Sequence, residues 1–300
     1  MTLRCRANKP IDNISMAVTQ SALVSTDALA EGLAENAWVV IDASWHMPDT
    51  GRDGRAEYEA GHIPGALFFD IDEVSDASSD LPHMLPSEDR FAEAVERLGI
   101  RNEDAVLVYD GAGLFSAARL WWMFRVFGHE NVFVLDGGLP KWKAEGRALE
   151  SQSFAAARSI FDTQFNPALL VNKQHIKTWS YEPDVALLDA RSWARFSGEE
   201  EDPRPGVRRG HIPHSLNLPY RTLLAKDGTL RDTNALRSLL DQAGVGDISQ
   251  PAMVTCGSGV TACIIALVYY ELGNAQVAVY DGSWAEWGAS GEPVATSEQG

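Results

Sequence analysis

A cysteine lies between a short apolar run and two closely spaced glycines in the last quarter of the chain. Cys256 follows the β-prone residues 253–255, and Gly257 and Gly259 come directly after it. An apolar helical pattern then begins near Val260. Cys256 is therefore expected at the end of a strand, where a loop opens a helix.

Such a loop favours the thiolate form of a cysteine. Gly257 and Gly259 let the backbone curl so that several N–H groups face one point, with the positive end of the helix dipole behind them. Both effects stabilise an anion, and the thiolate is the nucleophilic form of cysteine. We therefore predict that Cys256 is a catalytic nucleophile. The alternative is a small buried cysteine beside an ordinary tight turn.

Length, composition and charge limit the class of protein. The 300 residues suggest two domains, and 45% hydrophobic residues with nine tryptophans are enough for packed cores. A net charge of −17 argues against general binding to nucleic acids or anionic membranes, because both need a basic surface.

The cysteines and histidines indicate neither a disulfide framework nor a metal site. Only three cysteines occur: Cys256, Cys263 in an apolar run that suits a core, and Cys5 in a polar leader. The histidines are scattered, no Cys-x-x-Cys is present, and no cofactor is expected. The first 15 residues lack the apolar stretch of a secretory signal, so a cytoplasmic location is expected.

Four segments of the first half recur in the second half in the same order. Residues 38–43, 61–64, 105–113 and 132–137 recur as 185–190, 210–213, 251–259 and 277–282. The chain is therefore predicted to be a duplicated domain. The predicted parts are a flexible leader (1–16), an N-terminal domain (17–150), a linker (151–169) and a C-terminal catalytic domain (170–295).

Each copy alternates short Val/Leu/Ile-rich runs with helical patterns such as 91–98 and 116–127. This alternation predicts an α/β fold, with a mostly parallel sheet flanked by helices in each copy. Near-continuous apolar strands such as 106–108 fit sheets that are covered on both faces. Ligands bind such sheets beyond the carboxyl ends of the strands, which is where Cys256 is expected.

The two copies differ where the chemistry is expected. Aligning residues 109–113 with 255–259 places Asp110 opposite Cys256. The first copy keeps the loop but has no thiol, so we expect it to shape the site rather than to react. Other repeated residues, His62 with His211 and Asp136 with Asp281, are expected to be architectural because both copies share them.

The whole pattern resembles the two-domain rhodanese-type sulfurtransferases, which act on thiosulfate or 3-mercaptopyruvate. The resemblance covers about residues 17–295, and its motifs are the cysteine loop and residues 68–72, 121–129, 208–213 and 280–287. It implies two tandem rhodanese-like domains with the reactive cysteine in the second. The Trp121–Trp122 pair within these motifs is expected to be core.

Within this family, the sequence of the cysteine loop differs between enzymes that use different sulfur donors. Thiosulfate enzymes usually carry Cys-Arg-Lys-Gly-Val-Thr, whose cations suit a dianion, whereas residues 256–261 read Cys-Gly-Ser-Gly-Val-Thr, the form typical of 3-mercaptopyruvate enzymes. A cysteine phosphatase needs a Cys-x5-Arg loop to hold a phosphoryl group, and position 262 is Ala262. The phosphatase interpretation is therefore set aside.

The resemblance also implies which residues bind the substrate. Arg195 and Arg204 match the family arginines that hold the carboxylate and carbonyl oxygens of a 2-oxo acid, which suits a planar guanidinium. The alternative is surface ion pairing with the acidic run 199–202. Arg191 is a weaker candidate that can be structural. The remaining substrate-binding positions are loop residues Gly257, Gly259, Val260 and Thr261.

Three further residues match a family acid–base relay. Ser258 lies two residues after the nucleophile, and Asp72 and His83 in the first copy match its partners. A Ser–His–Asp relay across the domain interface could remove the proton of a substrate thiol. The alternatives are a turn-capping aspartate and a solvent-exposed histidine.

The function expected from this resemblance is sulfur transfer through a Cys256 persulfide, with release of pyruvate from 3-mercaptopyruvate. The acceptor is a thiol, such as thioredoxin or a small thiol, or cyanide. One alternative is a thiosulfate:cyanide sulfurtransferase. Another is a sulfur-carrier or redox-sensing protein without turnover.

Overall fold

Two five-stranded sheets form the framework of the protein. The computed structural model describes residues 21–151, 156–181 and 185–297, so Cys5 and the predicted leader lie outside the described residues. All strand pairs are parallel, which confirms the expected α/β class. The strands are β1 (Leu23–Val24), β2 (Val39–Asp42), β3 (Leu67–Phe68), β4 (Val106–Tyr109), β5 (Val132–Leu135), β6 (Leu170–Val171), β7 (Ala186–Asp189), β8 (Leu216–Asn217), β9 (Ala252–Thr255) and β10 (Val277–Tyr280).

The sheets have the same strand order, which confirms the internal duplication. The first runs β1-β5-β4-β2-β3 and the second β6-β10-β9-β7-β8. Every residue of the central strands β4 and β9 is buried, as expected when helices cover both faces. The domain boundaries at residues 17, 150, 170 and 295 stay predictions.

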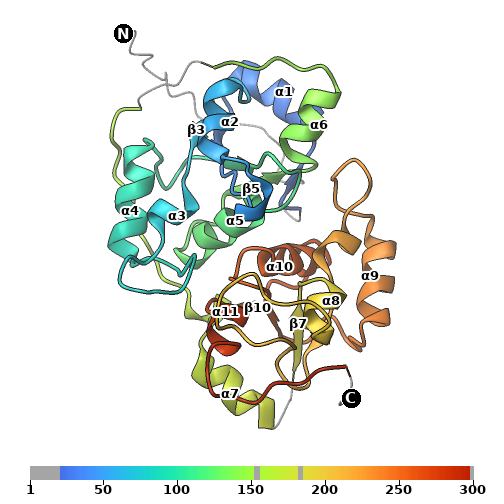
Figure 1. Ribbon diagram of the computed structural model, residues 1–300. Coiled ribbons are helices and arrows are strands. Elements are labelled where there is room, and N and C mark those ends of the chain that lie inside the picture. The colour runs from blue at the N-terminus through green and yellow to red at the C-terminus, as the bar shows by residue number, and fades with distance from the viewer. Residues whose placement is uncertain (1–20, 152–155, 182–184, 298–300) are drawn as a thin grey trace.

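Helices connect the strands and cover the sheets (Figure 1). The α-helices are α1 (Thr26–Glu35), α2 (Gly54–Ala60), α3 (Ile71–Val74), α4 (Glu88–Arg97), α5 (Ala117–Val126), α6 (Gly138–Ala144), α7 (Lys173–Tyr181), α8 (Trp193–Ser197), α9 (Thr233–Gln242), α10 (Ala262–Glu271) and α11 (Ser283–Trp287). The helices predicted over 91–98 and 116–127 correspond to α4 and α5. None of the described helices combines the length and the apolar character needed to cross a membrane.

The helix after the cysteine begins later than the sequence pattern predicts. We expected it near Val260, but α10 starts at Ala262, with Thr261 as its N-cap. Gly259 has a left-handed φ of 79°, and residues 260–261 form a turn. This turn inserts extra loop backbone between Cys256 and the helix.

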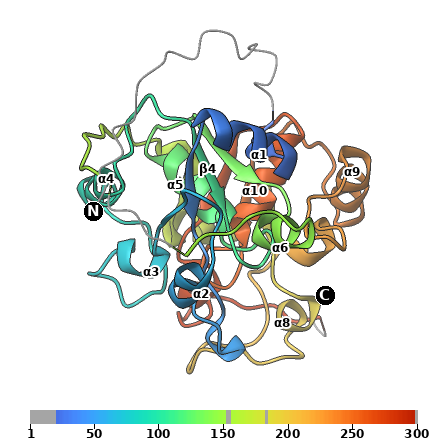
Figure 2. The same cartoon turned by 90° about the horizontal axis from the view of Figure 1, so that it is seen from above.

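Helices α5 and α10 pack against each other between the two sheets (Figures 1 and 2). All ten residues of α5 are buried, and so are the first eight of α10. Trp121 meets Tyr270 edge to face at 5.4 Å between ring centroids, and one hydrophobic cluster spans both halves. The expected core position of Trp121 and Trp122 is confirmed.

The repeated histidines are architectural, as expected. His62 Nδ1 lies 2.6 Å from the carbonyl oxygen of Tyr58, and His211 Nδ1 lies 2.8 Å from that of Phe196. Each imidazole also stacks on the ring of the same partner, with centroids 4.0 and 3.7 Å apart. The two histidines therefore fasten equivalent turns in the two copies.

Candidate active site

Cys256 forms part of the wall of a cavity between the two halves of the chain. It directly follows β9 and is only 2% exposed, yet it borders a cavity of about 380 Å³. The first half contributes residues 45–47, 112 and 114–115 among others, and the second half contributes the cysteine loop and several arginines. The position beyond the carboxyl end of a central strand is the one the sequence predicts.

The loop after Cys256 has backbone donors without protein acceptors. In the described part of the chain, no acceptor takes the N–H groups of residues 257–261. The equivalent loop of the first copy is filled by its own anion, because the Asp110 carboxylate accepts N–H groups at 2.7 to 2.9 Å. The donors are Ala112, Phe115, Ser116 and Ala117. The shared loop shape thus suits an anion, and in the second copy the residue at that place is Cys256.

The structure brings together the three residues of the predicted relay. His83 Nδ1 lies 2.8 Å from Ser258 Oγ, and His83 Nε2 lies 3.0 Å from Asp72 Oδ1. His83 is only 5% exposed, and it reaches the cavity through Ser258, which is one of the lining residues. His83 is thus buried rather than solvent-exposed, and the cap of the nearby helix α3 is Asp70 rather than Asp72.

The protonation state of Asp72 determines the direction of these hydrogen bonds. Partial burial works to raise the pKa of Asp72, but the hydrogen bond from His83 and a hydrogen bond from Trp45 hold it below its usual range. The carboxylate can only accept, so Nε2 carries the proton of the neutral imidazole. Nδ1 is then free to accept the Ser258 hydroxyl proton.

His83 holds this position in an unfavourable backbone conformation. Its φ is +61°, a left-handed value that costs a residue with a Cβ about 1–2 kcal/mol. The equivalent residue of the other copy is Gly228, with φ +83°, for which this conformation carries no such cost. This strain occurs in one of the two copies and not in the other. It therefore indicates that the His83 side chain is needed there.

Trp45 supports the relay and was not predicted from the sequence. Its Nε1 donates to Asp72 Oδ2 at 2.9 Å, so each carboxylate oxygen of Asp72 has a partner. The indole also meets the His83 ring edge to face at 4.5 Å. The sequence signal that could have indicated this role is the position of Trp45. It follows the end of β2 and aligns with Ser192 of the second copy.

The two predicted substrate arginines converge on the cysteine loop. A Cβ added to Gly257 would lie 3.3 Å from Arg204 Nη1 and 3.4 Å from Arg195 Nη2. Both guanidinium groups also pair with Asp202 of the acidic run, whose side chain is buried. The expected ion pairing and the expected position beside the loop therefore occur together. Because one carboxylate partners two cations, net positive charge is left facing the cavity. Among the described residues, Arg195 Nε is buried without a hydrogen-bond partner.

Some of the remaining predicted residues line the cavity, and the others support the structure around it. Val260 and Thr261 line the cavity. Gly259 does not; a Cβ there would lie 3.0 Å from both Arg119 Nη1 and the carbonyl oxygen of Asp281, so glycine is required for close packing. Arg191 borders the cavity but pairs with buried Asp189 at 2.6 Å, consistent with a structural role.

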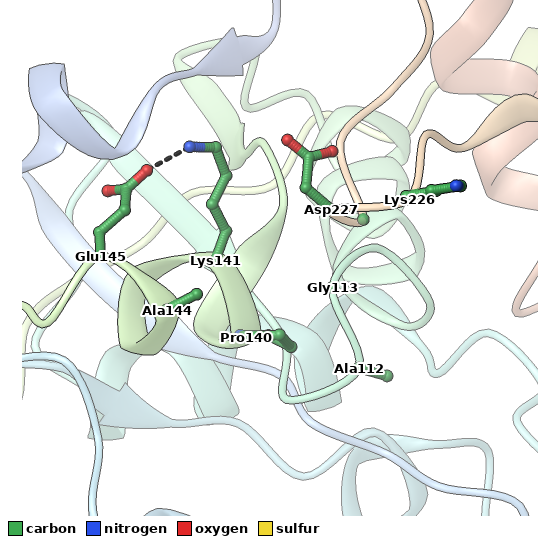
Figure 3. A pocket seen from close by; sticks show the side chains of 9 residues that line it. Ala112, Gly113, Pro140, Lys141, Ala144, Glu145, Lys226 and Asp227 are labelled. Carbon is green, nitrogen blue, oxygen red and sulfur yellow. Dashed lines mark hydrogen bonds and ion pairs between the residues drawn. The ribbon is translucent and has the colours of Figure 1, made fainter.

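A second cavity of about 450 Å³ lies between residues 112–113, the residues of α6 with Glu145, and residues 226–228 (Figure 3). Its lining residues offer neither a thiol nor a hydroxyl: Ala112 stands where the second copy has Ser258, and Gly228 stands where the first copy has His83. Lys141 pairs with Glu145 at its edge. In the described part of the chain, no three His, Cys, Asp or Glu side chains gather to hold a metal ion.

Comparison with known proteins gives consistent matches. The model of the rhodanese-like domain matches residues 25–145 and 172–290. The thiosulfate/3-mercaptopyruvate sulfurtransferase 1, mitochondrial, of Arabidopsis thaliana is 45% identical, over 90% of this chain and 76% of that protein. The human 3-mercaptopyruvate sulfurtransferase is 42% identical, over 93% and 96% of the two chains. A crystal structure of a 3-mercaptopyruvate sulfotransferase from Escherichia coli superimposes with a TM-score of 0.80 at 40% identity, covering 88% and 99% of the chains.

Proposed function

The chain belongs to the rhodanese-like family, and we propose that it is a sulfurtransferase that takes sulfur from 3-mercaptopyruvate onto Cys256. The observation that carries the choice of donor is the Ser258–His83–Asp72 chain of hydrogen bonds beside the cysteine. A donor with a thiol proton needs such a relay. Thiosulfate, which has no thiol proton at neutral pH, does not.

The first half-reaction loads the cysteine. The Cys256 thiolate attacks the sulfur of 3-mercaptopyruvate, an S–S bond forms, and the C–S bond breaks. The electron pair of the C–S bond passes to C3 as the enolate of pyruvate. Ser258 and His83 take the thiol proton and return it to C3, so pyruvate and a Cys256 persulfide anion result.

The surrounding residues would bind and stabilise the reacting groups. Arg195 and Arg204 suit the carboxylate and the 2-oxo group of the donor because guanidinium offers paired donors in one plane. The unpartnered amides of residues 257–261 suit the thiolate and then the terminal persulfide sulfur.

The second half-reaction unloads the cysteine. An acceptor thiolate or cyanide attacks the outer sulfur of the persulfide and leaves with it, which restores the Cys256 thiolate. Two half-reactions that share one covalent intermediate give ping-pong kinetics. The proposed acceptors are thioredoxin, a small thiol or cyanide.

The alternative donor is thiosulfate, which is part of the name of the Arabidopsis relative. Its two negative charges favour cations in the loop, and residues 257–258 here are glycine and serine. Comparing kcat/KM for the two donors tests the proposal. We expect the higher value for 3-mercaptopyruvate, and a higher value for thiosulfate would reverse the assignment. Persulfide formation without catalytic cycles would instead favour a sulfur carrier.

We also propose a cytoplasmic location and the domain limits 17–150 and 170–295. The two described cysteines are free thiols, as a reducing compartment allows. Cell fractionation tests the location, and recovery in mitochondria would contradict it. Limited proteolysis tests the boundaries, since cleavage is expected within 151–169.

A further inference from the structure

One arginine of the first half reaches across to the cysteine loop of the second half. Arg119 lies on α5 and is fully buried. Its Nη2 donates to the carbonyl oxygen of His83 at 2.5 Å and lies 2.7 Å from Asp281 Oδ1. Its Nη1 donates to the carbonyl oxygen of Gly259 at 3.4 Å. A single guanidinium therefore contacts the relay histidine, the cysteine loop and an aspartate of the second half.

Arg119 and Asp281 together hold the segment that carries the relay histidine. Asp281 Oδ2 accepts the N–H of Leu85 at 2.6 Å, so the segment is fixed at both His83 and Leu85. Burial works to lower the pKa of Arg119, but the charge of Asp281 raises it above its usual value, and the guanidinium stays charged. A charged donor on the His83 carbonyl helps to maintain its left-handed backbone.

The other copy provides an internal comparison. There Asp136 Oδ1 accepts the N–H of Leu230 at 2.8 Å, in the same way that Asp281 accepts that of Leu85. The residue at the place of His83 is Gly228, and in the alignment of the two loops the residue at the place of Arg119 is Ile265. The aspartate brace thus occurs in both copies, whereas the buried cation occurs only in the copy with the histidine.

We propose that Arg119 is a positioning residue for the loading half-reaction: it fixes the His83 backbone against the Gly259 carbonyl, so that His83 Nδ1 meets Ser258 Oγ. This inference rests on the proposed function. The half without the reactive cysteine then not only carries the relay residues Asp72 and His83 but also holds His83 in position. Loss of this fixation should impair the proton-transferring step and spare steps that need no relay.

The test separates the two half-reactions in Arg119→Lys. Lysine keeps the charge and the pair with Asp281, but one ammonium cannot replace a planar guanidinium at three acceptors. Rapid-quench mass spectrometry measures persulfide loading from 3-mercaptopyruvate, and thiocyanate formation measures discharge of a preloaded persulfide to cyanide. We expect loading to slow by about ten-fold or more, and discharge to change by less than about two-fold.

A second variant and a matched control complete the test. Asp281→Asn removes the charge that pairs with Arg119 and should show the same selective loss of the loading rate. This variant keeps the test available if Arg119→Lys does not fold. Asp136→Asn changes the equivalent brace of the other copy and should leave both rates within about two-fold of the wild type. Equal slowing of both half-reactions, or unchanged loading, in the variants at Arg119 and Asp281 would overturn the inference. A wild type that forms no persulfide would instead contradict the proposed function itself.

Discussion

Replacing His83 by asparagine tests the relay with the least disturbance of the fold. Asparagine tolerates the left-handed backbone that His83 adopts, with φ +61°, better than other non-glycine residues. It keeps a polar side chain in a site that is 5% exposed. What it removes is the acceptor nitrogen 2.8 Å from Ser258 Oγ, together with the ability to take a proton.

The structure sets the size and the selectivity of the expected effect. A positioned acid–base group contributes about 10²–10⁴-fold to a rate, so His83→Asn should lower kcat for 3-mercaptopyruvate by at least about 10²-fold. Thiosulfate brings no thiol proton, so its rate should change by less than about three-fold on the same reasoning. His83→Ala should be about 1 kcal/mol less stable than His83→Asn, because asparagine tolerates this φ better than alanine.

The assays follow one product from each donor. The formation of pyruvate measures the turnover of 3-mercaptopyruvate, and the formation of sulfite measures the turnover of thiosulfate. The acceptor is the same in both reactions. Urea unfolding of His83→Asn and His83→Ala separates backbone strain from chemistry. If both donors lose activity to the same degree in a well-folded His83→Asn, the relay reasoning is refuted.

Three further predictions follow from burial and close contacts. Iodoacetamide should label Cys256 and spare Cys263, because burial raises the pKa of Cys263 to about 12; peptide mapping that finds Cys263 modified in the folded protein would contradict this. Gly257→Ala brings a Cβ within 3.3 Å of a substrate-facing guanidinium nitrogen, so KM for 3-mercaptopyruvate should rise about three- to ten-fold while kcat changes little; an unchanged KM would show that the guanidinium groups are not involved. Burial raises the pKa of Asp42 to about 6 from 3.8, so the folded state binds more protons and the free energy of unfolding should fall as pH rises from about 4 to about 6, by at most about 3 kcal/mol for this group. In urea unfolding at several pH values, Asp42→Asn should make the free energy of unfolding less dependent on pH. Equal pH dependence in the variant and the wild type would contradict the role given to Asp42.

Local patterns were enough to predict the fold and the position of Cys256. Strand β9, the glycine loop and helix α10 are consecutive in the sequence, and the duplication repeats each signal. The start of α10 was placed too early, near Val260, because hydrophobic periodicity does not distinguish a turn from the first turn of a helix. Cys263 was correctly assigned to the core from its apolar neighbours.

The supporting residues of the site were harder to predict because they act across the domain interface. Ser258 and His83 are 175 positions apart, and only the family motif related them. Trp45, Asp202 and Arg119 carry no local signal of their roles. Arg119 stands in an otherwise apolar helix, and its contacts with His83 and Gly259 exist only after the two halves pack.

The most direct test of the account is the mass of the protein after reaction with 3-mercaptopyruvate and no acceptor. We predict one equivalent of pyruvate and an adduct heavier by one sulfur atom, located on the Cys256 peptide and removed by cyanide. Cys256→Ser should give neither product. Pyruvate formation at the wild-type rate by Cys256→Ser, or sulfur found on another residue, would contradict the central claim.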